Sequence, residues 1–156
     1  MGTRAMGTAE IQRWDEEPYD EPDGGPKLVR ASVAYRFEGD IDGESRLTYL
    51  MLYGDDGGAG FVGMERVVGR LGGRSGSFVL QHRGRFDGDA AWGDWSVVPG
   101  SGTGELRGLR GEGGFVARHG ERTDLDTWYA EEPTPPRVAR WGLDYELEEG
   151  DDRRAG

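Results

Sequence analysis

The chain has 156 residues, a formal net charge of −11, and neither cysteine nor asparagine. These counts exclude a disulfide scaffold, a thiol enzyme, a cysteine metal site and N-glycosylation. Acidic residues outnumber lysine and arginine by 30 to 19, the wrong sign for binding nucleic acid or an anionic membrane surface. No apolar run has the length of a membrane helix or of a signal-peptide core. We therefore expect one domain, located in the cytoplasm.

Apolar residues alternate with period two along most of the chain, and turn signals separate the runs. The pattern predicts strands at 6–14, 28–38, 45–53, 59–71, 76–86, 91–98, 114–118 and 140–148. The acidic, proline-containing stretch 15–26 is predicted to be a loop, and 105–109 a single helical turn. A polar excursion at 120–137 and a charged tail at 149–156 complete the domain, whose core spans about residues 5–148.

Eight strands joined mostly by short hairpins predict an all-β domain, a single eight-stranded antiparallel up-and-down β-barrel, because closure removes the sheet edges. A β-sandwich is the alternative. Four glycines within the runs fit the sharp bends of barrel strands; they are Gly63, Gly69, Gly84 and Gly93. The interior of a barrel of this size is filled by side chains or holds one small ligand.

Four segments resemble the uncharacterised bacterial family called domain of unknown function 3224. They are FVGMER at 61–66, GGRSGSFVLQH at 72–82, VVPGSGTGEL at 97–106 and LDYEL at 143–147. The resemblance covers about residues 5–147 and implies an eight-stranded barrel similar to that of allene oxide cyclase and dirigent proteins. The link at 120–137 is longer than the family's. The resemblance implies no settled activity and therefore assigns no catalytic residue.

Glu65 is the most distinctive candidate, because the alternation places it on the inward face of its strand. A hairpin centred on 72–73 sets Glu65 opposite residue 80, with His82 as a diagonal neighbour. The two form either an acid–base pair of an isomerase, cyclase or hydrolase, or a satisfied polar pair that fixes strand register. The hydrolase alternative requires a second carboxylate, such as Asp94 or Glu112, to converge on Glu65.

Inward aromatic residues predict either a ligand pocket or a packed core. The candidate ligand-binding residues are Tyr35, Tyr49, Phe78, Trp95 and Tyr145. Our leading expectation is a barrel that binds a small apolar or amphipathic molecule. The alternatives are the acid–base enzyme and a filled barrel that acts through its outer surface. Two histidines are too few for a catalytic zinc site, and we expect neither metal nor cofactor.

The third and fourth predicted strands carry apolar residues on both faces, whereas the outer face of a barrel is polar unless something covers it. The outward members are Leu50, Leu52, Val62, Met64 and Val68. We expect them to be covered by another copy of the chain, in a homo-oligomer, or by the excursion at 120–137.

Overall fold

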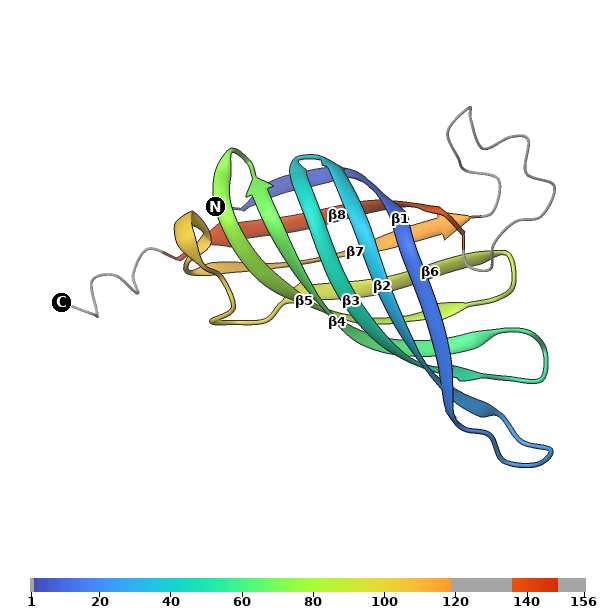
Figure 1. Cartoon of the computed structure of the whole chain (residues 1–156). Helices are drawn as coiled ribbons and strands as arrows, with labels where there is room; N and C mark the ends of the chain where they lie inside the picture. Colours follow the sequence, from blue (N-terminus) through green and yellow to red (C-terminus); the bar gives the residue numbers. More distant parts are fainter. Residues whose placement is uncertain (1, 119–135, 149–156) are drawn as a thin grey trace.

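Eight antiparallel strands close into a barrel in chain order (Figure 1). The structure is a computed structural model, and it describes residues 2–118 and 136–148. The strands are β1 (Thr3–Asp20), β2 (Lys27–Gly39), β3 (Ile41–Tyr53), β4 (Ala59–Leu71), β5 (Arg74–Phe86), β6 (Ala90–Val97), β7 (Leu109–Arg118) and β8 (Val138–Leu147). The predicted up-and-down barrel is confirmed, and the sandwich alternative is wrong.

A short 3-10 helix, η1 (Gly104–Leu106), precedes β7 and overlaps the start of the helical turn predicted at 105–109. Within the described ranges, no helix has the length and apolar character needed to cross a membrane. The expected excursion at 120–137, apart from Pro136 and Arg137, and the expected tail at 149–156 lie outside the described residues.

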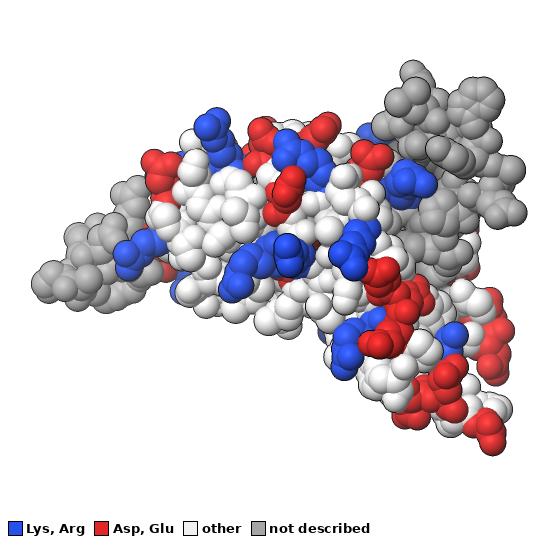
Figure 2. Space-filling model, viewed as in Figure 1, with Lys and Arg blue, Asp and Glu red and all other residues white. Residues whose placement is uncertain are grey.

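β1 closes the barrel with its first half and extends beyond it with its second half. Residues 3–10 pair with β8, whereas residues 13–20 pair only with β2. The segment 15–32, which we call the acidic arm, therefore has a free edge along β1, while its β2 half also pairs with β3, and it projects from one end of the barrel (Figure 1). The space-filling view shows acidic side chains gathered on this projection (Figure 2).

The acidic arm corrects the prediction of a loop over 15–26, because β1 continues through Pro18 to Asp20. Proline lacks an N–H and is excluded from central strands, but it is tolerated at an edge, where no ladder bond is lost. β1 has only one neighbour here, so it is an edge. Cross-strand contacts support the pairing: Arg30 approaches Glu17 at 3.8 Å and lies over the Tyr19 ring.

Two other strands, β3 and β7, begin four and five residues before their predicted starts. β3 begins at Ile41, which is fully buried, so the turn before it is shorter than the sequence suggested. β7 begins at Leu109 and runs through a glycine-rich stretch. A Cβ on Gly113 would lie 2.0 Å from the carbonyl oxygen of Gly142, so glycine permits β7 and β8 to approach closely there. The glycines that suggested a loop are instead required by a strand.

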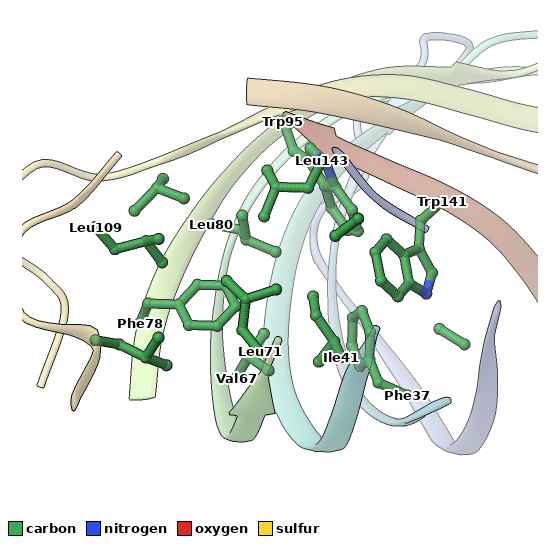
Figure 3. Close-up of a cluster of buried hydrophobic side chains, with 14 residues drawn as sticks. Phe37, Ile41, Val67, Leu71, Phe78, Leu80, Trp95, Leu109, Trp141 and Leu143 are labelled. Atoms are coloured by element: carbon green, nitrogen blue, oxygen red, sulfur yellow. The ribbon is translucent and has the colours of Figure 1, made fainter. Parts of the chain in front are cut away.

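Side chains fill the barrel from end to end, in two apolar clusters. Figure 3 shows the first, which includes Phe37, Leu71, Phe78 and Leu80, and η1 contributes the fully buried Leu106 to it. The second cluster gathers smaller and aromatic side chains from β2 to β5, with Phe61 and Phe86 among them. Inward alternation on every strand supplies both clusters, as expected for a barrel of eight strands.

Candidate functional site

A chain of polar side chains crosses the interior of the barrel. Ser45 Oγ donates to Glu65 Oε2 at 2.5 Å, and Glu65 Oε1 lies 2.7 Å from His82 Nε2. The other ring nitrogen, His82 Nδ1, lies 3.3 Å from the hydroxyl of Tyr49. We call these four residues the buried chain. Ser45, Glu65 and His82 are between 1% and 4% exposed, so the predicted inward placement of Glu65 and His82 is confirmed.

Strand register brings the buried chain together. Glu65 on β4 faces Leu80 on β5, which makes His82 its diagonal neighbour, as the hairpin centred on 72–73 predicts. Ser45 approaches from the other side, on β3. Tyr49, Gly63 and His82 form one row across β3, β4 and β5. A Cβ at Gly63 would lie 2.6 Å from the Tyr49 ring, so this glycine makes room for the tyrosine.

Aromatic rings surround the imidazole of His82. The ring centroids of Trp95 and Phe115 each lie 5.3 Å from that of His82, and Tyr49 lies at 5.5 Å. These apolar surroundings exclude water and disfavour charge. Burial raises the pKa of the Tyr49 hydroxyl well above its ordinary value, and the neighbouring Tyr35 and Glu65 raise it further. Burial likewise raises the pKa of Tyr35, with the charge of Glu65 adding to the effect.

The order of the buried chain decides which chemistry it supports. In a nucleophilic triad the serine is bound to the histidine, and the acid holds the other ring nitrogen. Here Ser45 and His82 both bind Glu65, and Tyr49 occupies the second ring nitrogen. Ser45 therefore has no histidine beside it, and its hydroxyl is held by the carboxylate of Glu65 instead. Each of the four polar side chains of the buried chain has a hydrogen-bond partner, which is what a buried polar network requires.

The cavity beside the buried chain is about 20 Å³. It is lined by Ala9, Tyr35, Phe37, Tyr49, Glu65, His82, Trp95, Phe115, Ala139 and Trp141. A single water molecule needs about 10–15 Å³, whereas ligand pockets measure about 300–1,000 Å³. The cavity therefore has the size of one water molecule.

Three of the five predicted ligand-binding residues, Tyr35, Tyr49 and Trp95, line this cavity. Phe78 and Tyr145 do not: Phe78 is buried in the first apolar cluster, and Tyr145 packs at its edge. The predicted convergence of Asp94 or Glu112 on Glu65 is wrong. Both carboxylates lie on exposed, outward-facing positions of β6 and β7, because the alternation of those strands points Trp95 inward instead.

A second candidate site lies on the outer surface, across β2 to β5. We call it the arginine groove, and its volume is about 880 Å³. Its outward-facing lining includes Gln12, Ala34, Glu44, Arg46, Met64, Arg66, Val68 and Val79, and it also reaches Tyr35, Ser45 and Glu65. Arg46 and Arg66 occupy directly opposed positions on β3 and β4. Apolar side chains flank the two guanidinium groups along both strands.

Neither arginine of the groove has an ion-pair partner among the described residues. Glu44 lies on the same face of β3, yet it forms no ion pair with either one. Sequence reasoning missed this pair because it searched the inward face for chemistry. The turn at 55–58 sets the register of β3 against β4, so counting back from it does place Arg46 opposite Arg66.

In the described part of the chain, no three His, Asp or Glu side chains are grouped as metal ligands. Among curated proteins, none matches the chain. A solved structure does: a protein of unknown function from the DUF3224 family of Shewanella oneidensis MR-1, with 28% sequence identity and a TM-score of 0.69. The match covers 95% of this chain and 99% of that one. The model of the family "Protein of unknown function (DUF3224)" matches residues 5–129. With most of the barrel inside that match, the chain belongs to the DUF3224 family.

Proposed function

We propose that the protein is a binding module that holds an amphipathic carboxylate in the arginine groove, on the outside of the barrel. One observation carries the proposal: Arg46 and Arg66 are directly opposed on β3 and β4 without an acidic partner among the described residues. Directly opposed like charges destabilise a sheet. A bound anion would remove this repulsion, and a guanidinium group can donate two parallel hydrogen bonds to one carboxylate.

The surroundings of the two arginines suit the rest of such a molecule. Met64 and Val68 lie beside Arg66 on the same face of β4, and Val79 follows on β5. They offer an apolar wall to an alkyl chain whose head group lies between the guanidinium groups. The net charge of −11 repels every anion, so the apolar wall is what would favour an amphipathic carboxylate over a small polar anion.

The interior gives less support for a ligand or a reaction. A cavity of about 20 Å³ leaves no space for an organic molecule beside Glu65 and His82. An isomerase or cyclase activity, as expected from a cyclase-like barrel, would require a substrate there. We therefore assign the buried chain a structural role, in which it fixes the register of β3, β4 and β5. Function then belongs to the outer surface, on a rigid filled barrel.

Calorimetric titration with decanoate tests the proposal. We expect decanoate to bind, and the single variants Arg46→Gln and Arg66→Gln to weaken it about tenfold or more, since one charge-assisted hydrogen bond contributes about 1.5–3 kcal/mol. Arg74→Gln is the matched control, because Arg74 is an exposed arginine on the same sheet outside the groove. Decanol, which lacks the charge, should bind far more weakly than decanoate.

Two results would overturn the proposal. The first is the absence of decanoate binding to the wild-type protein. The second is binding of equal strength to the wild type and to the Arg46→Gln/Arg66→Gln double variant. In that case, a decanoate-dependent change in tryptophan fluorescence would indicate entry into the barrel near Trp95 and Trp141, which are both buried.

A further inference from the structure

An apolar surface runs along the outer face of β3 and β4, in line with the arginine pair of the arginine groove. Outward residues of the two strands oppose each other in rows, and Arg46 and Arg66 form one such row. The rows that follow in one direction are Thr48–Met64, Leu50–Val62 and Leu52–Gly60. Their four large apolar side chains, which we call the apolar stripe, are 43% to 51% exposed. Contiguous exposed apolar surface of this kind marks an interaction site.

The opposite direction from the arginine pair offers no comparable surface within the described residues. Glu44 and Val68 form the next row there, and Asp42 and Arg70 form the one after it. An alkyl chain laid in that direction would meet one apolar side chain and then charged ones. A molecule whose carboxylate lies between the guanidinium groups therefore removes more apolar surface from water along the apolar stripe than over Val68.

The apolar stripe is long and narrow. Its three rows span about 20 Å at the rise of a strand, and its two strands lie about 5 Å apart. Charged side chains border it on both sides, with Arg30 of β2 opposite Leu50 and Arg83 of β5 opposite Val62. Such a ribbon supplies far less than the roughly 800 Å² per partner of a stable protein interface. A single extended alkyl chain fits this shape, and the methylene stems of the bordering arginines add apolar contact.

The far end of the apolar stripe is hollowed. A groove of about 660 Å³ lies there, and its lining includes Leu52, Gly60, Arg85 and Trp92. Gly60 leaves space in it, because a Cβ at that position would meet no atom of the described residues within 4 Å. The end of an alkyl chain that follows the apolar stripe would therefore lie in this groove, beside Trp92.

We infer that the ligand of the arginine groove is a long-chain fatty acid, with its carboxylate between Arg46 and Arg66 and its alkyl chain along the apolar stripe. The inference rests on the function proposed above and adds the direction and the length of the chain. It commits to a free fatty acid rather than to a lipid surface, because the net charge of −11 opposes adsorption to an anionic membrane.

Calorimetric titration with fatty acids of different length, below their critical micelle concentrations, tests the inference. The last row lies about 20 Å from the arginine pair, so decanoate ends before it and the longer myristate reaches it. We expect myristate to bind about tenfold more tightly than decanoate, since its additional methylene groups leave water. Leu52→Gln should weaken myristate binding roughly threefold or more and leave decanoate binding unchanged. Met6→Gln is the matched control, because Met6 is 54% exposed on β1, outside both grooves.

A bromine atom at the end of the alkyl chain locates that end, because bromine quenches tryptophan fluorescence on contact. We expect 14-bromotetradecanoate to quench the wild-type protein, and Trp92→Phe to abolish the quenching. Quenching that persists in Trp92→Phe would place the chain elsewhere, such as inside the barrel near Trp95 and Trp141, and would overturn the inference.

The titrations separate this inference from the proposed function. Equal affinities for decanoate and myristate, both lost in Arg46→Gln/Arg66→Gln, would overturn the path of the chain and leave the proposed function intact. The apolar stripe would then be left to another occupant, such as a protein partner. Tighter binding of myristate that survives Leu52→Gln would overturn the path as well. Failure of both fatty acids to bind the wild-type protein would overturn the inference and the proposed function together.

Discussion

Glu65 occupies the middle of an apolar barrel, where an unpaired carboxylate would be strongly unfavourable. The buried chain gives both carboxylate oxygens a hydrogen-bond partner. Ser45 donates to Oε2, Oε1 lies 2.7 Å from His82 Nε2, and His82 Nδ1 lies 3.3 Å from the Tyr49 hydroxyl. Each polar side chain of the network therefore has a partner inside the barrel. Complementary hydrogen bonding matters here more than ionic attraction.

This account predicts different effects for two substitutions at position 65. Glu65→Gln keeps an acceptor for Ser45 and offers an N–H to His82, so it should lower the free energy of unfolding by only about 1 kcal/mol. Glu65→Ala leaves both partners unsatisfied and should cost about 3–5 kcal/mol. Urea denaturation of the two variants measures the difference. Equal losses would mean that the negative charge itself is required.

The raised pKa values of Tyr35 and Tyr49 predict loss of stability in alkali. Both phenols are neutral in the folded and unfolded states below pH about 10, the ordinary tyrosine pKa, so stability is unaffected there. Above it, the unfolded chain releases protons that the folded barrel retains, and the free energy of unfolding falls as pH rises. Urea midpoints measured across this range, with tyrosinate absorbance, test the prediction.

Tyr35→Phe is the control for the alkaline effect. Tyr35 makes no side-chain hydrogen bond within the described residues, so the substitution removes one titrating group without breaking the buried chain. The slope of stability against pH should become shallower in this variant. An unchanged slope would show that Tyr35 titrates normally in the folded protein.

Some glycines are required by the packing around their strand and others are not, and the structure shows which ones are required. Gly63→Ala should cost about 1–3 kcal/mol by overpacking, because its Cβ would meet the Tyr49 ring and the carbonyl oxygen of Thr48, both at 2.6 Å. Gly60→Ala, three residues earlier on β4, meets nothing within 4 Å and should change stability by no more than about 0.5 kcal/mol. Thermal denaturation of the pair measures this; similar losses would contradict the proposed role of Gly63 in placing Tyr49.

Strand positions and inward faces followed well from alternation, and β4 matched at both ends. Predictions from local composition were wrong where the pairing partners of a strand decide its conformation. Pro18 is tolerated because β1 is an edge there, and the glycines of β7 serve its close approach to β8. Both facts depend on pairing partners distant in sequence.

The candidate site was predictable to a similar extent. Hairpin register placed Glu65 beside His82, because their turn is short and local. Ser45 and Tyr49 come from β3, and their part in the buried chain depended on rotamers and on the space above Gly63. The size of the cavity depended on the packing of every inward side chain together. The alternation of apolar residues does not show how completely the inward side chains fill the barrel. The size of the cavity could therefore not be predicted from the sequence.

The barrel as a whole should unfold in one step. Every strand is paired on both sides along the barrel body, so none can leave without breaking two ladders. We expect urea transitions followed by tryptophan fluorescence and by far-UV circular dichroism to coincide, with a spectrum that lacks helical character. Separated midpoints would indicate that the acidic arm or one cluster of the core unfolds independently.

Closure between the first and last strands has a consequence for how the molecule is made. Each hairpin from β1–β2 to β6–β7 joins strands that are close in sequence. The pairing of β1 with β8 instead joins distant residues, such as Thr3 with Tyr145 and Glu10 with Val138. Such distant pairings slow folding, and an open strand edge recruits other chains. On the ribosome, β1 is the first strand to emerge and keeps one bare edge until the final strand arrives. Premature termination before Val138 would therefore release a sheet with two free edges, prone to aggregate rather than to close.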